Sequence, residues 1–339
     1  MNDYEKAVVT STQKSTPAVV SVYISGTQYF RFANPVYDMM YGVQRKDISA
    51  MGSGVIIDPK GTIITNDHVV DDVNGSSGAK IQVVLSDGRN FQAKVVKELP
   101  KQDIAILKID AKDLPYIEMG NSSELVPGQT VIVIGNPFGT SISDGLKGGE
   151  PTVTKGIISA TKRNLRIPMD NGEIKYYRNM LQTDASINEG NSGGALIDLN
   201  GKLVGINTAI LSEGSGSIGI NFAIPADRVK LILESIKKYG DVTDVVSGIK
   251  VIPLNEKIVK SLNFKGQGGV IISDVESGSP GDRGGFRKGD IITGINGFTV
   301  VNEQQSRSMF KGAVPGEVYD VKIFRDGNYT DLNLKLDPK

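Results

Sequence analysis

Short runs of β-branched residues, separated by turns that contain glycine, recur along most of this 339-residue chain. Residues 55–64 read as a strand, an Asp-Pro-Lys-Gly turn and a second strand, which is the pattern of a β-hairpin. A similar unit returns at 195–204, where Gly194, Asp198 and Gly201 repeat the mutual spacing of Gly54, Asp58 and Gly61. Further strands are expected at 17–24, 81–86, 91–97, 104–109, 130–135, 152–160 and 203–210. The pattern predicts a mostly β fold built from two related units.

Composition narrows the classes of function. The 40 glycines have no three-residue period, which excludes collagen, and the 39% hydrophobic and 22% charged residues indicate a globular chain. Lys and Arg balance Asp and Glu at 38 each, so net charge favours neither nucleic acid nor an acidic membrane surface. The absence of cysteine excludes disulfides, thiol catalysis and cysteine-bound zinc.

The ends of the chain bear on its compartment. The first five residues begin no basic segment followed by an apolar run, so no signal peptide is expected, and no stretch is apolar for the length of a membrane span. The expectation is therefore a cytoplasmic protein, or a chain that begins after a removed signal or anchor.

A second domain is expected after the β units. Apolar residues at helical spacing in 227–239, followed by Gly240, predict a helix that closes a first domain over 1–239. Residues 240–246 are the expected linker, and 247–337 have the size and strand signals of one small domain. Within the first domain, residues 26–51 carry aromatic residues without a regular period, which predicts a long loop.

A candidate nucleophile lies in the segment from Asp184 to Gly194. Glycines on both sides of Ser192 would let the amides of Gly190 and Ser192 converge on one point, as an oxyanion site requires. The alternative interpretation is an ordinary Gly/Asn/Ser turn between strands.

His68 and Asp103 complete a candidate catalytic set. His68 is the chain's single histidine and follows a predicted strand, and histidine is the usual base for a serine nucleophile. Asp103 begins an apolar strand, where a buried carboxylate needs a partner such as the second imidazole nitrogen. A surface histidine and a turn-capping aspartate are the alternatives. The order His, Asp, Ser is that of chymotrypsin-like proteases.

Several segments carry a family resemblance. They are Thr65-Asn66-Asp67-His68-Val69-Val70, Asp103-Ile104-Ala105-Ile106-Leu107-Lys108-Ile109, Gly135-Asn136-Pro137-Phe138-Gly139, Thr183–Leu196, Gly205-Ile206-Asn207-Thr208-Ala209 and Gly219-Ile220-Asn221-Phe222-Ala223-Ile224-Pro225. Together they resemble the HtrA/Deg serine proteases. The resemblance implies two six-stranded β-barrels of the trypsin-like fold, a homotrimer, no ATP, no metal or other cofactor, and unfolded or misfolded proteins as substrates.

The resemblance also implies roles for individual residues. Gly190, Asn191 and Ser192 would form the oxyanion loop, and Arg163 would be a regulatory relay residue in a sensor loop that begins at Thr161. The pocket for the residue before the cut would be lined by Ile187, Ile206, Asn207 and Thr208. The family more often has glycine in place of Lys162. The Gly-rich insertion at 140–151 makes the activation loop of this chain longer than the family's usual one.

The C-terminal segment resembles a PDZ domain. The residues that carry this are Gly269-Val270-Ile271-Ile272, Ser277–Phe286 and Gly289–Gly297, and the carboxylate-binding loop corresponds to Ser247, Gly248, Ile249 and Lys250. Such a domain binds peptide C-termini as an added strand; a plain spacer domain is the alternative. The implied function is an ATP-independent serine endopeptidase of the periplasm or cell envelope that binds no nucleic acid. The alternative is a peptide-binding chaperone or scaffold with latent protease activity.

Overall fold

The computed structural model describes residues 1–31, 34–71, 77–136, 150–168, 174–188, 190–208, 219–266 and 268–339. These residues form two compact units. One comprises Met1–Arg163 and Asn179–Asp227, and the other comprises Asn164–Arg178 and Arg228–Lys339. The insertion predicted at 140–151 lies outside the described residues except for Glu150 and Pro151.

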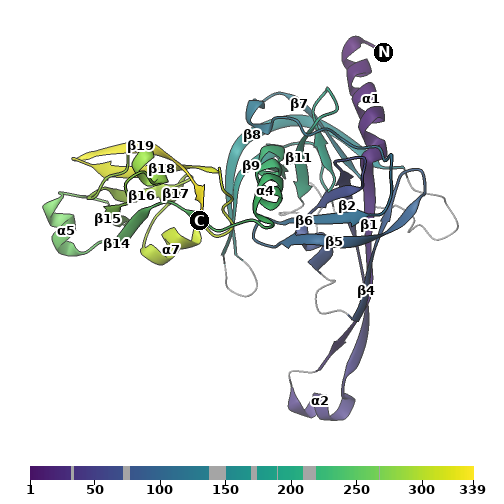
Figure 1. The fold of residues 1–339 in the computed structure, drawn as a ribbon, viewed down its shortest axis with the longest axis horizontal. Coiled ribbons are helices and arrows are strands. Elements are labelled where there is room, and N and C mark those ends of the chain that lie inside the picture. Colours follow the sequence, from purple (N-terminus) through teal and green to yellow (C-terminus); the bar gives the residue numbers. More distant parts are fainter. Residues whose placement is uncertain are drawn as a thin grey trace. The chain divides into compact units, whose positions relative to one another are not determined.

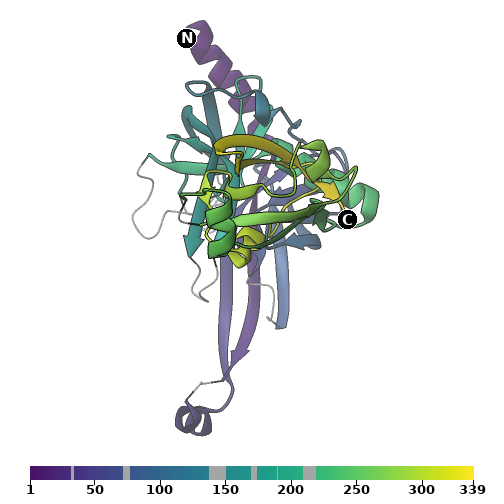
Figure 2. The same cartoon turned by 90° about the vertical axis from the view of Figure 1, so that its left-hand side faces the viewer.

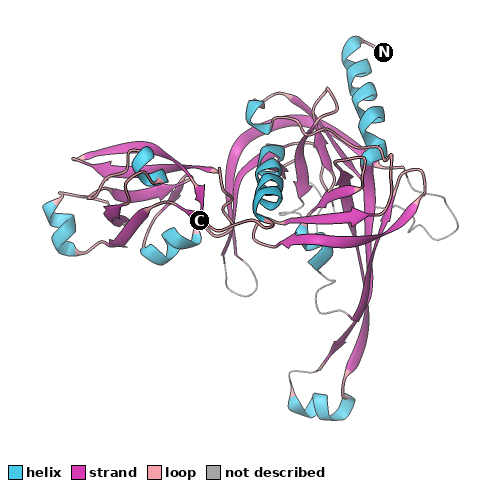
Figure 3. Cartoon of the chain, in the orientation of Figure 1, coloured by secondary structure: helices cyan, strands magenta, loops and turns pink. Residues whose placement is uncertain are grey.

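The first unit contains two β-barrels (Figures 1 and 3). The first barrel closes in the strand order β1-β2-β3-β6-β5-β4. Its strands are β1 (Val19–Phe30), β2 (Gln44–Ile56), β3 (Thr62–Thr65), β4 (Ser77–Val84), β5 (Asn90–Leu99) and β6 (Ile104–Ile109). Helix α3 (Asp67–Val70) follows β3 directly. Five of the six residues of β6 are buried, and because side chains alternate along a strand, both faces of β6 are covered.

The second barrel closes in the order β10-β11-β12-β9-β8-β7. Its strands are β7 (Thr130–Gly135), β8 (Thr152–Pro168), β9 (Ile174–Thr183), β10 (Ala195–Ile197), β11 (Leu203–Thr208) and β12 (Asn221–Pro225). The N-terminal helix α1 (Asp3–Ser15) contacts the β10–β11 turn, where the Ser15 hydroxyl donates to the Gly201 carbonyl at 3.3 Å. The prediction of a mostly β fold with two six-stranded barrels is confirmed.

The segment 26–51 is not the long loop that its sequence predicted. β1 and β2 continue past the barrel as a two-stranded ribbon, paired from Val19 opposite Val55 to Phe30 opposite Gln44. A short helix, α2 (Pro35–Tyr41), lies at the end of this ribbon, away from the barrels in both views (Figures 1 and 2). Alternation of apolar and polar residues marks a strand only where one of its faces covers a core. An isolated ribbon covers none, so the periodic signal is missing.

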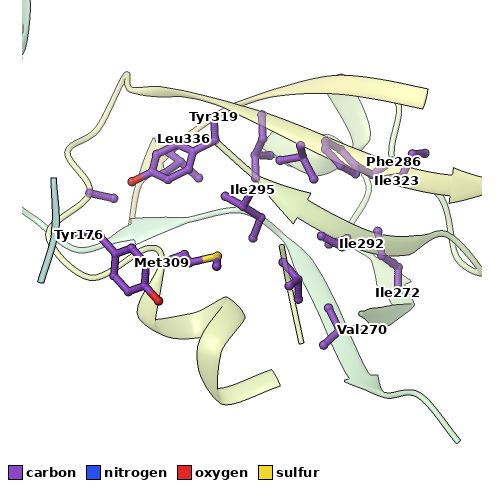
Figure 4. Packing of buried hydrophobic residues seen from close by; sticks show 14 residues of the cluster. Tyr176, Val270, Ile272, Phe286, Ile292, Ile295, Met309, Tyr319, Ile323 and Leu336 are labelled. Carbon is purple, nitrogen blue, oxygen red and sulfur yellow. The ribbon is translucent and has the colours of Figure 1, made fainter. Parts of the chain in front are cut away.

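The second unit is built on one antiparallel sheet in the order β14-β15-β16-β18-β19. Its elements are β13 (Val245–Val246), β14 (Ile249–Pro253), α5 (Glu256–Ser261), β15 (Val270–Val275), α6 (Pro280–Arg283), β16 (Ile291–Ile295), β17 (Phe298–Thr299), α7 (Glu303–Ser308), β18 (Val318–Arg325), β19 (Asn328–Lys335) and β20 (Asp337–Pro338). Figure 4 shows its core, in which Ile295, Met309 and Tyr319 are buried among aliphatic side chains. β13 pairs with β20, so part of the segment expected as linker is strand.

The β8–β9 hairpin contributes Asn164–Arg178 to this second unit. Tyr176 joins its hydrophobic core (Figure 4), and the buried Arg178 donates to the carbonyls of Met309 at 2.8 Å and Lys311 at 2.5 Å. Burial lowers the pKa of the Arg178 guanidinium. These hydrogen bonds offset the cost of burying its charge.

Helix α4 (Ala226–Tyr239) matches the helix predicted from apolar spacing to within one residue. Its end is formed by Gly240, whose N–H donates to the Ile236 carbonyl at 2.8 Å and whose φ of 79° suits glycine. Among the described residues, none of the helices combines the length and apolar character needed to cross a bilayer.

Candidate active site

His68 lies beside the carboxylate of Asp103. The imidazole Nδ1 is 2.9 Å from Oδ1 and 3.1 Å from Oδ2, and the His68 backbone N–H donates to Oδ1 at 3.3 Å. Helix α3 positions the ring, because it turns the chain immediately after β3. The His68 side chain is 47% exposed, whereas that of Asp103 has no exposed surface. An acceptor on Nδ1 holds the ring in the tautomer that leaves Nε2 free of its proton.

Asp103 adopts an unusual backbone conformation. Its φ of 56° lies in the left-handed region, which aspartate and asparagine tolerate better than most residues. The Asp103 carbonyl accepts from the Asn66 side-chain amide at 3.0 Å, so the segment before α3 also fixes this position. The Asp103 carboxylate faces His68.

Thr208 reaches the same carboxylate from the second barrel. Its hydroxyl donates to Asp103 Oδ2 at 3.3 Å. The sequence placed Thr208 in the substrate pocket, and this contact with Asp103 was not foreseen. The sequence could not show this contact, because only the packing of the barrels brings the end of β11, where Thr208 lies, to the start of β6.

Ser192 lies in a tightly hydrogen-bonded loop. The Asn191 N–H donates to the Asn188 carbonyl at 3.0 Å, and Gly193 N–H donates to the Asn207 carbonyl at 2.9 Å. Gly193 has a φ of 82°, and a Cβ there would collide with the Ser53 carbonyl and the Thr65 hydroxyl. The Asn191 amide, one of the three predicted for the oxyanion loop, is therefore occupied within the loop.

Ser53, on β2, holds this loop against the first barrel. Its N–H donates to the Ser192 carbonyl at 2.8 Å, and its hydroxyl donates to the Gly190 carbonyl at 2.6 Å. The neighbouring Gly52 has no room for a side chain: a Cβ would lie 2.6 Å from Val69 Cγ1 and 3.3 Å from the Ser192 carbonyl oxygen. Val69, which follows His68, and Ser192, the candidate nucleophile, therefore both pack against β2 at Gly52. Sequence reasoning missed Ser53; its small-residue context, Gly-Ser-Gly, was the available signal.

The predicted pocket residues lie deeper than expected. Ile187 has no exposed surface and belongs to the hydrophobic core of the second barrel, and Ile206 is also fully buried. The Asn207 side-chain amide donates to the Ala195 carbonyl at 3.0 Å, so it supports β10. The two isoleucines are therefore part of the packed interior of the second barrel rather than open walls of a pocket.

Arg163 lies on β8, not in a loop. Its Nε donates to the Gln182 side-chain oxygen at 2.9 Å and so links β8 to β9. Gln182 lies on the strand that leads into the Ser192 loop, so this hydrogen bond connects Arg163 to the chain segment that enters that loop.

The second unit contains a cavity of about 350 Å³ beside the predicted carboxylate-binding loop. Its lining is mostly apolar and comes from β14, α7 and other parts of the sheet. The apolar lining side chains include Ile249, Val251, Phe286, Ile295, Phe310 and Leu334, and the polar ones include Ser247 and Lys250. β14 is the outer strand of the sheet, so an extended peptide could add to it.

The loop that precedes β14 requires glycine at one position. Gly248 has a φ of 68°, and a Cβ there would collide with Ser279. The Ser247 hydroxyl accepts from the Ile249 N–H at 3.2 Å, and thereby occupies one amide of the carboxylate-binding loop.

Comparison with known proteins relates both units to characterised families. A trypsin-like peptidase domain model matches residues 52–206, and a PDZ domain model matches residues 241–336. The probable periplasmic serine protease do/HhoA-like of Haemophilus influenzae is 35% identical over 344 residues, which cover 96% of this chain and 70% of the relative. A solved structure of the HtrA-type protease AlgW with decapeptide is 33% identical, covers 98% of each chain and superposes with a TM-score of 0.59. The chain belongs to the HtrA-type serine protease family.

Other HtrA-type relatives extend beyond this chain. The periplasmic serine endoprotease DegP of Escherichia coli K12 is 41% identical over 297 residues, which are 87% of this chain but 58% of DegP. The chain thus spans somewhat more than half the length of that relative. The serine endoprotease from Yersinia pestis, a solved structure, is 30% identical with a TM-score of 0.53 and covers 100% of this chain.

This HtrA-type chain departs from the family at Lys162, where the family more often has glycine. Lys162 has a φ of 56°, in the region where a side chain is strained and glycine is not. That conformation explains why glycine suits the position, and Lys162 adopts it immediately before Arg163.

Proposed function

We propose that this chain is an ATP-independent serine endopeptidase whose catalytic residues are His68, Asp103 and Ser192. The observation that carries the proposal is the placement of the His68 Nδ1 within 3.1 Å of both oxygens of a fully buried carboxylate. A buried carboxylate paired with a half-exposed imidazole is suited to hold the ring and to stabilise the imidazolium that forms during proton transfer.

The proposed reaction proceeds through an acyl-enzyme. His68 Nε2 takes the hydroxyl proton of Ser192 as Oγ attacks the carbonyl carbon of the scissile peptide bond. The amides of Gly190 and Ser192 donate to the resulting oxyanion. His68 then gives the proton to the departing amine nitrogen, and the C–N bond breaks. A water molecule, deprotonated by His68, then attacks the Ser192 ester. The bond from the acyl carbon to Oγ breaks, His68 returns the proton to Oγ, and the new carboxyl end of the substrate leaves.

The proposed specificity rests on the chemistry of Ile187 and Ile206. Both side chains are uncharged and fully buried, and a substrate pocket that ends on them would accept a small aliphatic residue such as Val, Ala or Ile. We expect most cuts in a digested unfolded protein to follow these residues, as read by sequencing the fragments. A majority of cuts after Lys or Arg would refute this pocket.

The proposed substrates are unfolded or misfolded proteins, and the PDZ domain is proposed to bind peptide C-termini in the cavity beside Ile249. The relatives named as periplasmic support a periplasmic location for this chain. A homotrimer is proposed from family membership and is testable by analytical ultracentrifugation. Regulation is proposed to involve Arg163, since its hydrogen bond to Gln182 acts on the strand that leads to the Ser192 loop.

The decisive experiment replaces the nucleophile. Ser192→Ala should lower the rate of casein cleavage by about 10⁶-fold, while circular dichroism and oligomeric state stay unchanged. A serine-reactive phosphonate should label the unmodified protein and not the variant. Wild-type cleavage by a pure Ser192→Ala preparation would overturn the proposal. Suppression of casein aggregation without any fragments from the unmodified protein would favour the chaperone interpretation instead.

A further inference from the structure

The tip of the β1–β2 ribbon exposes an unusual amount of apolar surface. Met39 is 91% exposed and Met40 is 69% exposed. Five more large hydrophobic residues of the tip are each more than half exposed: Tyr29, Val36, Tyr37, Tyr41 and Val43. Contiguous apolar surface of this kind marks an interaction site in a soluble protein.

The apolar surface wraps around most of α2. Successive residues of an α-helix are about 100° apart, so Val36, Tyr37, Met39, Met40 and Tyr41 cover an arc of roughly 200°. Tyr37 and Tyr41 stack with ring centres 6.1 Å apart on one side of that arc. A helix that packs on one protein surface needs an apolar stripe of about half this width. The width therefore favours a medium that surrounds the tip over a groove that accepts one face.

Charged groups are placed behind the apolar arc. Asp38 is the single charged residue of α2, and its carboxylate lies 3.5 Å from the Arg31 guanidinium at the end of β1. Arg45 is exposed on β2, directly opposite Tyr29 in the strand register. Arg31 and Arg45 thus both lie at the base of the tip, one on each side of the ribbon. Cations next to tyrosines, behind an apolar end, match the layering of a bilayer surface: phosphate groups outside and acyl chains within.

We propose that the tip of the β1–β2 ribbon inserts into the interface of a bilayer that contains anionic phospholipids. Val36, Met39 and Met40 enter the acyl region, Tyr37 and Tyr41 lie at the headgroup level, and Arg31 and Arg45 contact lipid phosphates. The contact is peripheral, because α2 is far too short to cross a bilayer. It would hold the protease at a membrane surface without involving any residue of the active site.

The chain contains no tryptophan, which permits a direct test in the full-length protein. Met39→Trp places a single tryptophan, which can be excited selectively over tyrosine, at a position of the tip that is 91% exposed. Its emission should shift to shorter wavelength with vesicles of equimolar phosphatidylcholine and phosphatidylglycerol, and brominated lipid acyl chains should quench it. Tyr116→Trp, at an exposed site elsewhere on the first unit, should show neither effect.

Sedimentation with the same vesicles measures separately what the apolar residues and what the arginines of the tip contribute to vesicle affinity. The double variant Met39→Asp/Met40→Asp should lower vesicle affinity by about tenfold or more. Arg31→Gln and Arg45→Gln should each lower it by about fivefold, and should have little effect on vesicles of pure phosphatidylcholine. Val126→Asp, an exposed apolar residue far from the tip in sequence, is the matched control. All four should cleave a short peptide at the wild-type rate, which shows that they fold.

Three results would overturn the proposal. The first is an emission shift of Met39→Trp that grows with protein concentration in the absence of vesicles, which would place a second copy on the tip. The second is a shift with unfolded casein but none with vesicles, which would make the tip a substrate-binding arm. The third is vesicle binding that the aspartate substitutions leave unchanged.

Discussion

The hydroxyl of Thr208 donates a hydrogen bond to Oδ2 of Asp103, 3.3 Å away, and this contact joins the last residue of β11 to the residue before β6. The two residues belong to different barrels. Asp103 therefore has partners from both: His68 from the first barrel and Thr208 from the second. The orientation of the proposed catalytic carboxylate depends on how the two barrels pack.

Removing this hydroxyl should weaken catalysis without weakening substrate binding. Thr208→Val leaves the buried carboxylate with one donor fewer, and we expect kcat to fall by about tenfold. KM should change little, because Thr208 acts on Asp103. Thr208→Ser should retain most of the wild-type kcat. Steady-state cleavage of a short peptide measures both constants; an increase in KM at constant kcat would instead support the pocket role assigned from sequence.

The left-handed backbone of Asp103 separates two substitutions that remove the same charge. Asp103→Asn should lower kcat by about 10⁴-fold, because an amide in place of the carboxylate favours the wrong imidazole tautomer. It should fold normally, since asparagine tolerates the φ of 56°. Asp103→Ala should lose activity and also about 1–2 kcal/mol of unfolding free energy. Urea denaturation distinguishes the two variants, and equal stability would argue against backbone strain at this position.

The proposed role of His68 sets the sign of the pH dependence. The imidazole must be neutral to accept the Ser192 proton, so kcat/KM should rise with pH across about 6 to 8, where an imidazole ordinarily titrates. His68→Gln should be inactive throughout this range. The oligomeric state has to be measured at each pH, because a change in assembly could produce the same rise. A variant that merely displaced the curve would rule out His68 as the base.

Ser247 should reduce the affinity of the PDZ domain for peptide C-termini. Its hydroxyl occupies the Ile249 amide at 3.2 Å, and a bound carboxylate has to displace it. Ser247→Ala should therefore tighten binding of a peptide with an apolar C-terminal residue by about three- to tenfold in fluorescence polarisation. An amidated peptide should show no gain. Ser273→Ala, which removes a hydroxyl bonded to the Lys250 carbonyl, is the control. Unchanged or weaker binding by Ser247→Ala would contradict this role.

Local sequence patterns carried much of the fold and of the candidate site. Alternating apolar runs and glycine turns predicted most of the barrel strands, and helical spacing predicted α4 to within one residue. These signals are readable because each element buries one face in a core. The same rule explains the failure over 26–51: the β1–β2 ribbon has no core to cover, so its strands leave no periodic signal.

The sequence by itself determined which groups are available for chemistry: one histidine, a serine between glycines and an aspartate before an apolar strand. Only the tertiary structure decided how they are held. Ser53 and Thr208 act on residues more than a hundred positions away, through closure and packing of the barrels. The burial of Ile187 in a core, rather than in an open pocket wall, was decided in the same way. A local pattern records a residue's neighbours along the chain, whereas hydrogen bonds and burial at this site depend on segments that folding brings together.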